Sequence, residues 1–531
     1  MNAPSRAPAA ESSFAEEALR LGGKSEEEVR RTGAIDRADD QVERLFKQQY
    51  QTAQSPIHRA IWDARVPFEL FQASPEPNDP RVQQVMQQSL EVVRRHREAK
   101  TLFDANLKIS SQVLEDLAGA GYWGLLVDSA YGGSGAKFRS FAPFLTRMAT
   151  LDATVSGLGS VHGCIGAVDP VQTFGSAEQK QRLLPKLASG ARLSAFALTE
   201  PNAGSDLTAL RTVARRDGES FLVNGEKLFI TNVVPGRTIG LVCLLEGKPA
   251  VLICDLPDQE NEQFQFRKYG LYALKHTWNQ GMVFRDFRVP VENLLVPANG
   301  NGLTIAYHGL NLGRVALCAN AAGSMRQMLA SMVSWARFRV TYGESIGARE
   351  LVRRRLGRLA GLIVACDALV AWCSGLIDQG FRGEMECIVA KIFGSEALKA
   401  KIGSLVISTG DTVVYSRVRM CGRLAVPTIR QNTSARKLRR DSSNSRRSST
   451  VPAGSPAKGS ACDGMPASGR AFNSSCRRSR RQASAAVASF FGRRASARSA
   501  AWISRCGALV SLRSLTRRCA AARSEEHTSE L

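Results

Sequence analysis

Residues 196–206, Phe-Ala-Leu-Thr-Glu-Pro-Asn-Ala-Gly-Ser-Asp, form a short apolar run that breaks at Pro201 into a loop of small residues. This order is typical of a strand that enters a turn. Thr199 and Ser205 carry hydroxyls, and glycine at Gly204 lets a ligand approach bare backbone. Such a loop can offer N–H and O–H donors to the ring and phosphate oxygens of a ligand. A Gly-Ser-Asp sequence is more often an ordinary loop, so the rest of the chain must decide between the two interpretations.

Residues 195–297 around this loop have the pattern of a small antiparallel β domain. The dipeptides Asp217-Gly218 and Asn224-Gly225 predict hairpin turns, and Gly247-Lys248 predicts another. The alternating or apolar runs between these turns predict strands over 211–216, 220–223, 227–231, 239–245, 250–256 and 284–289.

Helical patterns lie on both sides of the β domain, in residues 81–194 and 298–405. The first region has a helical stripe of apolar residues, and Ser110 and Ser176 are placed to cap helices. The stripe consists of Val82, Val85, Met86, Leu90 and Val93. In the second region, long helices are predicted over 310–338, 354–377 and 384–405. His162, in the first region, is expected to pack or cap rather than catalyse.

The two ends of the chain lack this organisation. Residues 1–80 are a polar extension with a helix start at Ser25 and a rigid break at 75–80. Residues 406–531 are rich in Arg, Ser and Ala, a composition typical of disorder. The last residues, 523–531, resemble a translated sequencing-library adapter, which indicates a frameshifted or chimeric reading frame. A genuine basic tail is the alternative.

The net charge of +23 for 531 residues is concentrated in the tail. Residues 431–531 hold 20 Lys and Arg against 5 Asp and Glu, which leaves +8 for the rest of the chain. Neither a membrane-spanning run, a secretory signal nor a metal-binding spacing is apparent, so we expect a reduced cytoplasmic protein with no membrane or metal partner. Nucleic acid binding through the arginines is not expected, because no aromatic stacking pattern accompanies them.

Several motifs in a fixed order are similar to those of the acyl-CoA dehydrogenase family over roughly 83–405. Besides 196–206, they are Asn224-Gly225-Glu226-Lys227-Leu228-Phe229-Ile230-Thr231-Asn232, Phe287 to Leu295, Gly309-Leu310-Asn311-Leu312-Gly313-Arg314, Arg337-Phe338-Arg339-Val340-Thr341-Tyr342-Gly343, and Ala390 to Glu396. The resemblance implies an α+β fold. It has an N-terminal helical domain (81–194), a middle antiparallel β domain (195–297) and a C-terminal helical bundle (298–405), followed here by the basic tail.

The resemblance also implies an FAD cofactor. Phe196, Leu198 and Thr199 would line the flavin, and Ser205 would bond the pyrophosphate and border the substrate channel. Phe229 would cover the dimethylbenzene side of the ring and Thr231 would donate to N5. A second group would reach the FAD of a neighbouring subunit, in a homodimer or homotetramer: Arg339, Thr341 and Tyr342.

The implied reaction is α,β-desaturation of an acyl-CoA, with Asn311 and Arg314 on the CoA arm and electrons passed to an acceptor such as electron-transfer flavoprotein. The catalytic glutamate remains unassigned. A Tyr-Glu-Gly-Thr-like motif is missing after Leu405, and Gly313 stands where a minority of the family has the glutamate. An acyl-CoA oxidase-like enzyme and a non-catalytic flavin-binding protein are the alternatives.

Overall fold

The computed structural model describes residues 14–409, except 64–65, 72–78, 205 and 272–273. The extension contributes α1 (Phe14–Leu21), α2 (Glu26–Glu43) and α3 (Pro56–Trp62), with short 3₁₀ turns at Gln48–Tyr50, Thr52–Gln54 and Phe68–Phe71. Ser25 caps α2 by accepting a hydrogen bond from Glu28 N, so the helix start predicted there is confirmed.

The N-terminal helical region contains α4 (Pro80–Glu98), α5 (Ser111–Gly119), α6 (Phe138–Leu151), α7 (Ala153–Ser160), α8 (Val168–Phe174) and α9 (Ala177–Ala188). The predicted stripe on α4 is confirmed, with Val82, Met86, Leu90 and Val93 buried and Val85 partly buried. Both predicted caps are also confirmed: Ser110 accepts from Val113 N, and Ser176 forms a reciprocal capping box with Gln179.

The middle region is an eight-stranded sheet within the described residues, ordered β6-β7-β3-β2-β4-β5-β8, with β1 added beside β4. Its strands are β1 (Ser194–Ala197), β2 (Val213–Asp217), β3 (Ser220–Thr231), β4 (Thr238–Leu245), β5 (Lys248–Asp255), β6 (Phe264–Arg267), β7 (Asn279–Pro290) and β8 (Leu294–Leu295). The sheet is antiparallel except that β1 and β2 each pair with β4 in parallel.

One predicted turn is wrong. Asp217-Gly218 does join β2 to β3, but Asn224-Gly225 lies inside β3, which continues to Thr231. The register against β7 shifts between Val223 and Gly225, and Gly225 has a φ of 154°. A Cβ on Gly225 would lie 2.6 Å from the backbone Cα of Thr212, so glycine is needed here for close approach within a bulged strand.

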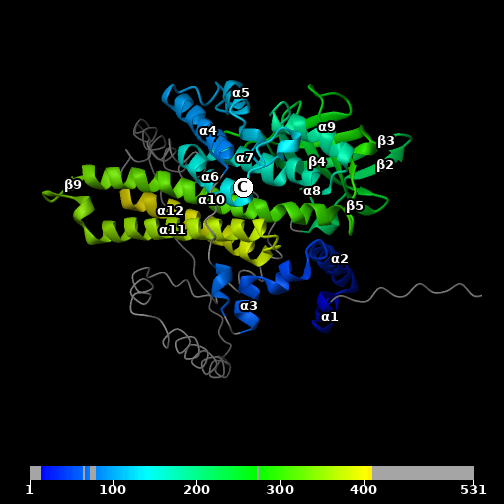
Figure 1. The fold of residues 1–531 in the computed structure, drawn as a ribbon, viewed down its shortest axis with the longest axis horizontal. Helices are drawn as coiled ribbons and strands as arrows, with labels where there is room; N and C mark the ends of the chain where they lie inside the picture. Colours follow the sequence, from blue (N-terminus) through cyan, green and yellow to red (C-terminus); the bar gives the residue numbers. More distant parts are fainter. Residues whose placement is uncertain (1–13, 64–65, 72–78, 205, 272–273, 410–531) are drawn as a thin grey trace, which may run out of the picture. The chain divides into compact units, whose positions relative to one another are not determined.

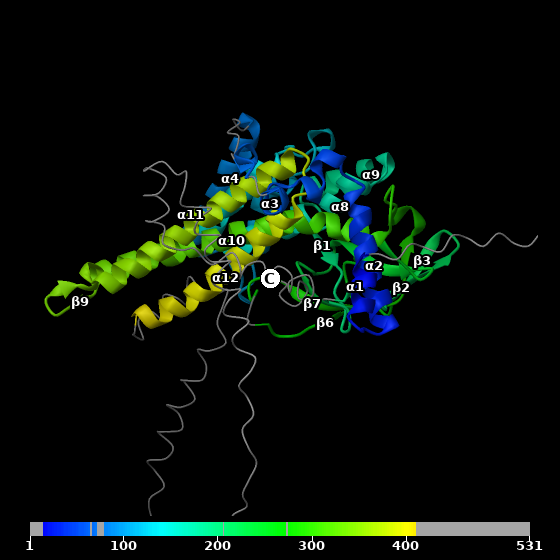
Figure 2. The same ribbon diagram turned by 90° about the horizontal axis from the view of Figure 1, so that it is seen from below.

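The C-terminal region consists of three long helices that run side by side: α10 (Gly302–Phe338), α11 (Glu350–Asp378) and α12 (Glu384–Thr409) (Figure 1). Between α10 and α11 the chain makes a small hairpin of β9 (Val340–Thr341) and β10 (Glu344–Ser345), which lies at the far end of both helices (Figures 1 and 2). Asn301 caps α10, so this helix begins eight residues before the predicted start.

The core of the helical regions is shared between the two halves of the chain. Side chains of α4, α5 and α6 pack with those of α10, α11 and α12 in one buried apolar cluster. The helix α11 is long and apolar enough, by length and composition, to cross a membrane, with a mean hydropathy of 1.9 over its most apolar window. In the structure it packs against α6, α10 and α12.

Candidate cofactor and substrate site

The loop that follows β1 begins in a tightly packed setting. Phe196 lies opposite Gly240 of β4, and a Cβ on that glycine would lie 2.6 Å from the Phe196 ring. Leu198 and Thr199 come next and are both buried, at 4% and 7% exposed. Three of the predicted cofactor residues therefore lie on β1 or directly after it. The fourth, Ser205, lies outside the described residues.

A buried ion pair fixes the conformation of this loop. Lys227 of β3 is fully buried, and its Nζ donates to the Leu198 carbonyl and to Glu200 Oε1, both at 2.8 Å. Glu200 in turn accepts from the backbone N–H groups of Arg211 (2.6 Å) and Thr212 (3.1 Å). The pair thus ties together β3, the loop after β1 and the segment that enters β2.

The charges of this pair follow from its surroundings. Burial raises the pKa of Glu200, but the charge and hydrogen bond of Lys227 and the other donors lower it by more, so the net shift is downward. Burial lowers the pKa of Lys227, and the charge of Glu200 opposes that shift. The ammonium donates to two acceptors, and the geometry is that of a charged pair.

An irregular segment of β3 presents Phe229 beside the loop. The register against β7 shifts between Lys227 and Ile230, and Leu228 N donates to the Thr199 carbonyl at 2.9 Å. Phe229 has a φ of 57° and its side chain is 45% exposed, with its ring edge against Tyr269. A left-handed backbone at a non-glycine residue stores strain, and such strain is concentrated at functional sites.

Thr231 lies two residues beyond Phe229 at the end of β3. Its Oγ1 accepts a hydrogen bond from Asn279 Nδ2 at 2.9 Å, and the same amide also donates to the Phe229 carbonyl at 3.2 Å. Since Asn279 uses the acceptor side of the hydroxyl, the O–H of Thr231 can donate to a ligand. Asn279 therefore orients both predicted residues.

His162 is a structural residue, as the sequence predicts. It is 1% exposed; Nδ1 accepts from Ser194 N at 3.0 Å, so Nε2 carries the proton and donates to the Leu187 carbonyl at 3.2 Å. Burial lowers its pKa to about 4. A neutral imidazole therefore connects the start of β1 to the end of α9.

The two residues predicted to bind the CoA arm lie together on α10. Asn311 and Arg314 are each 6% exposed, and Arg314 Nη1 donates to Asn311 Oδ1 at 2.7 Å. Asn311 Nδ2 donates to the carbonyl of Arg382, in the turn before α12, at 2.9 Å. Arg314 also lies 3.8 Å from Glu384, which pairs with the Arg382 guanidinium at 3.0 Å.

Gly313 does not supply a base, and its packing explains the absence of a side chain. A Cβ at this position would lie 2.5 Å from Ile165 Cδ1, in the π-helical turn Val161–Ile165. The other position expected for a catalytic glutamate, after Leu405, falls mostly on residues outside the described ranges.

The third predicted group is separate from the other two. Arg339, Thr341 and Tyr342 belong to the β9–β10 hairpin, where Tyr342 is 99% exposed with a φ of 52°. Arg349 shapes this hairpin by donating to the Thr341 carbonyl at 2.7 Å. At about 1.5 Å per residue along α10, Arg339 is roughly 37 Å from Arg314, too far to share a contact with it.

The residues after β1 and at the end of β3 suit a planar, partly polar ring. Thr231 presents a hydroxyl donor, the Thr199 carbonyl accepts from Leu228 of the same strand, and Phe229 is partly exposed. Sequence reasoning missed the residues that hold this arrangement: Glu200, Lys227 and Asn279. The first two stand inside quoted motifs, but strand periodicity alone does not show that an internal lysine faces inward.

Comparisons with known proteins find matches along most of the described chain. Residues 81–191, 195–287 and 300–407 match the N-terminal, middle and C-terminal domain models of acyl-CoA dehydrogenase, respectively. An acyl-CoA dehydrogenase of Bacillus subtilis (strain 168) is 33% identical over 307 residues, which are 56% of this chain and 79% of that protein. The chain spans less than half the length of other curated relatives, such as the probable acyl-CoA dehydrogenase FadE10 of Mycobacterium tuberculosis (31% identity, 54% of this chain, 45% of that protein).

Solved structures share the fold. Butyryl-CoA dehydrogenase from Megasphaera elsdenii aligns with a TM-score of 0.56 at 24% identity, covering 62% of this chain and 89% of the other. An acyl-CoA dehydrogenase from Bacillus anthracis complexed with FAD aligns with a TM-score of 0.58 at 23% identity, covering 70% and 69%.

Proposed function

Because this chain belongs to the acyl-CoA dehydrogenase family, we propose that it binds FAD beside the loop after β1 and the end of β3, and catalyses α,β-desaturation of an acyl-CoA thioester. The observation that carries this proposal is the loop after β1, which a buried Lys227–Glu200 pair holds against the bulge that presents Phe229 and Thr231. Bound FAD would supply the hydride acceptor, and an electron-transfer flavoprotein would take the electrons onward.

The chain's own residues have distinct parts in this proposal. Thr199 and Thr231 donate to the polar edge and N5 side of the flavin, and Phe229 shields the ring from water. Asn311 and Arg314 hold the CoA arm of the substrate on α10. Hydrogen-bond donors placed before substrate arrives favour the charge that develops in the transition state, because they need no further reorganisation.

Purified full-length chain supplied with FAD is expected to be yellow, and its flavin absorbance is expected to bleach when acyl-CoA is added without oxygen. Protein that binds no flavin would contradict the whole proposal. Yellow protein that binds acyl-CoA without bleaching would instead support a non-catalytic flavin-binding protein. Gly313, packed on Ile165 where a minority of the family has the glutamate, is the observation that favours this second candidate.

We further propose that Arg339 serves the FAD of a neighbouring subunit. The end of α10 exposes Phe338 (76%), and the hairpin after it exposes Val340 (61%) and Tyr342 (99%). Exposed apolar groups of this kind are typical of surfaces that a partner covers. An arginine fork matches phosphate oxygens, so this residue suits the pyrophosphate.

Arg339→Ala is expected to weaken FAD binding by about 10- to 100-fold, the effect of losing a hydrogen bond to a charged group. The measurement is the dissociation constant from flavin fluorescence, together with the melting temperature. Arg337→Ala, an exposed change in the last turn of α10, is the matched control and should leave both values unchanged. Full FAD affinity in Arg339→Ala would exclude the shared site.

A further inference from the structure

The N-terminal extension contacts the body of the protein along the predicted substrate site. Residues 14–71 precede every family-model match, which begins at residue 81. Arg31 of α2 pairs with Asp206, at the end of the loop after β1, and its Nε donates to Thr208 Oγ1 at 3.4 Å. The extension therefore contacts the loop assigned to the cofactor.

A second contact lies at the residues assigned to the CoA arm. Glu43, the last residue of α2, has its Oε2 3.5 Å from Arg382 Nη1, and the Tyr50 carbonyl accepts from Arg382 N at 2.9 Å. The carbonyl of this same Arg382 is the acceptor for Asn311. The extension therefore hydrogen-bonds to Arg382, and Arg382 in turn accepts a hydrogen bond from Asn311, a residue predicted to bind the CoA arm.

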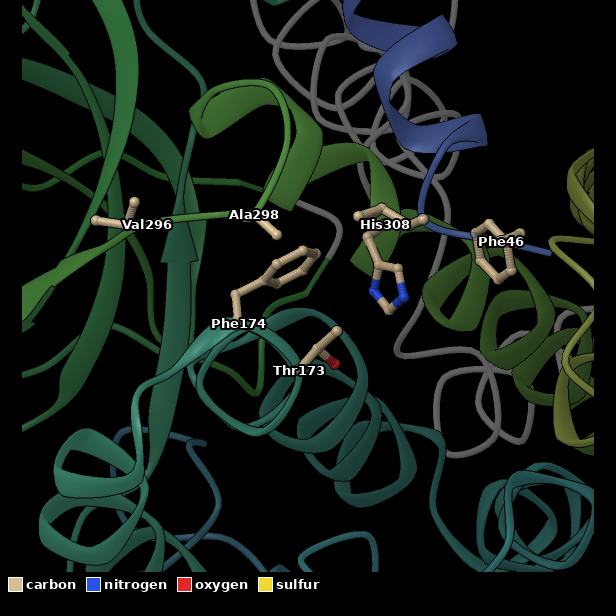
Figure 3. A pocket seen from close by; sticks show the side chains of 7 residues that line it. Phe46, Thr173, Phe174, Val296, Ala298 and His308 are labelled. Atoms are coloured by element: carbon tan, nitrogen blue, oxygen red, sulfur yellow. The ribbon is translucent and has the colours of Figure 1, made fainter.

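A cavity of about 410 Å³ lies where the extension meets α8 and α10. Figure 3 shows the His308 ring between the rings of Phe174 and Phe46. The residues that line the cavity come from the extension, α8, the segment before α10 and α10 itself: Leu45, Phe46, Thr173, Phe174, Val296, Ala298 and His308. Two of its seven lining residues therefore come from a segment that the family models do not include.

The lining has two phenylalanine rings and one imidazole, that of His308. Phe46 lies nearly parallel to His308, with centroids 6.2 Å apart, and Phe174 meets His308 edge-on at 5.2 Å. His308 Nδ1 lies 3.4 Å from Asp169 Oδ2. Burial lowers the pKa of His308, but the charge and hydrogen bond of Asp169 raise it by more. Aromatic rings and an imidazole whose protonated form Asp169 favours suit a purine nucleotide.

The cavity also lies next to the CoA-arm residues. His308 precedes Asn311 by three residues, so both face the same side of α10. The cavity volume is within the range of about 300–1,000 Å³ typical of small-molecule sites. Phe46, Phe174 and His308 would contact the base, and the CoA-arm residues further along α10 would contact the rest of the same ligand.

We propose that the N-terminal extension is the outer wall of the substrate site, and that the cavity beside Phe46 and His308 takes the adenine nucleotide end of the acyl-CoA. This inference rests on the proposed function, since it assigns a place to one end of that substrate. It makes Phe46 a specificity-determining residue, because a thioester that lacks the nucleotide gains nothing from the cavity.

The test compares two non-reactive probes with the same acyl group: an acyl-CoA thioether and the corresponding acyl-pantetheine thioether. Calorimetry on the FAD-loaded full chain gives both dissociation constants. Phe46→Ala is expected to weaken the CoA probe by about 5- to 100-fold, the range for loss of one stacking ring, and to leave the pantetheine probe unchanged. Phe46→Tyr, which keeps the ring, should restore the affinity for the CoA probe.

Phe71→Ala is the matched control. Phe71 also belongs to the extension and stacks on an aromatic ring, that of Trp372 at 4.8 Å, but it does not line the cavity. This control should bind both probes like the wild type.

Three results would overturn the inference. They are an unchanged affinity in Phe46→Ala, an equal loss for both probes, and an equal loss in Phe71→Ala. A wild-type protein that binds neither probe would overturn the proposed function itself. The three results above would overturn only the role of the extension in substrate binding.

Discussion

Replacing Lys227 with methionine is expected to lower the free energy of unfolding by about 3–5 kcal/mol, the usual cost of removing one partner of a buried ion pair. Methionine has a similar length and fills the space, so the loss is electrostatic rather than a cavity effect. Glu200 would remain buried at 6% exposed without its charged partner, and the Leu198 carbonyl would lose the Lys227 donor. Urea denaturation of the FAD-free protein measures the change.

The neighbouring pair provides the control. Glu226 precedes Lys227 on the same strand and pairs with Arg267 at 2.6 Å, but the Arg267 side chain is 56% exposed. Arg267→Met should therefore cost less than about 1 kcal/mol. The double variant Lys227→Met/Glu200→Gln should be less destabilised than the two single losses added together, because it leaves no uncompensated charge. Strict additivity would show that the pair is not coupled.

The same pair also predicts a loss of flavin. Since Lys227 holds Leu198 and Glu200, its loss should loosen the loop and weaken FAD binding more than an equally destabilising change elsewhere in the sheet. This links the energetics of one buried charge to the proposed cofactor site.

Much of the fold could be predicted because local signals agree with the tertiary structure. Ser25, Ser110 and Ser176 each begin a helix, since a serine side chain satisfies an otherwise unpaired backbone N–H wherever the helix lies. The apolar stripe on α4 also reports directly which face is buried.

The failures arise where distant parts of the chain decide the local conformation. Asn224-Gly225 is a strong turn signal, but pairing with β7 on one side and contact with Thr212 on the other keep β3 extended through it. Likewise, a lysine in a strand usually predicts an exposed face, and only the position of Glu200 makes burial of Lys227 possible. The partners of Gly225 (β7 and Thr212) and of Lys227 (Glu200) are too distant in sequence for a local pattern to reveal them.

The candidate site divides in the same way. A family resemblance assigns the residues within the quoted motifs one by one, and their cofactor and substrate roles stay predictions. Glu43 and Phe46 could not be found by this route, since the extension lies outside the resemblance and shows no chemistry of its own. We assign them a role only because the folded chain places Glu43 beside Arg382 and Phe46 beside His308.

Stability between pH 6.5 and 4 is expected to depend on His162. Its pKa is about 4 in the folded protein and 6.5 in an unfolded chain, so between these values the unfolded state binds the proton and the folded state does not. Stability therefore falls as the pH falls through this window. A shift of this size corresponds to about 3 kcal/mol, lost progressively between pH 6.5 and pH 4.

His162→Asn isolates this contribution. The amide oxygen can still accept from Ser194 N, but the side chain no longer titrates, so the variant should show a shallower decline in unfolding free energy as the pH is lowered. Trp123→Phe is the control: it changes the ring that meets His162 at 5.6 Å and keeps the imidazole. That control should be destabilised by a similar amount at every pH. If His162→Asn and the wild type instead give parallel curves, the imidazole is not held neutral, and the hydrogen bonds assigned to its two nitrogens are wrong.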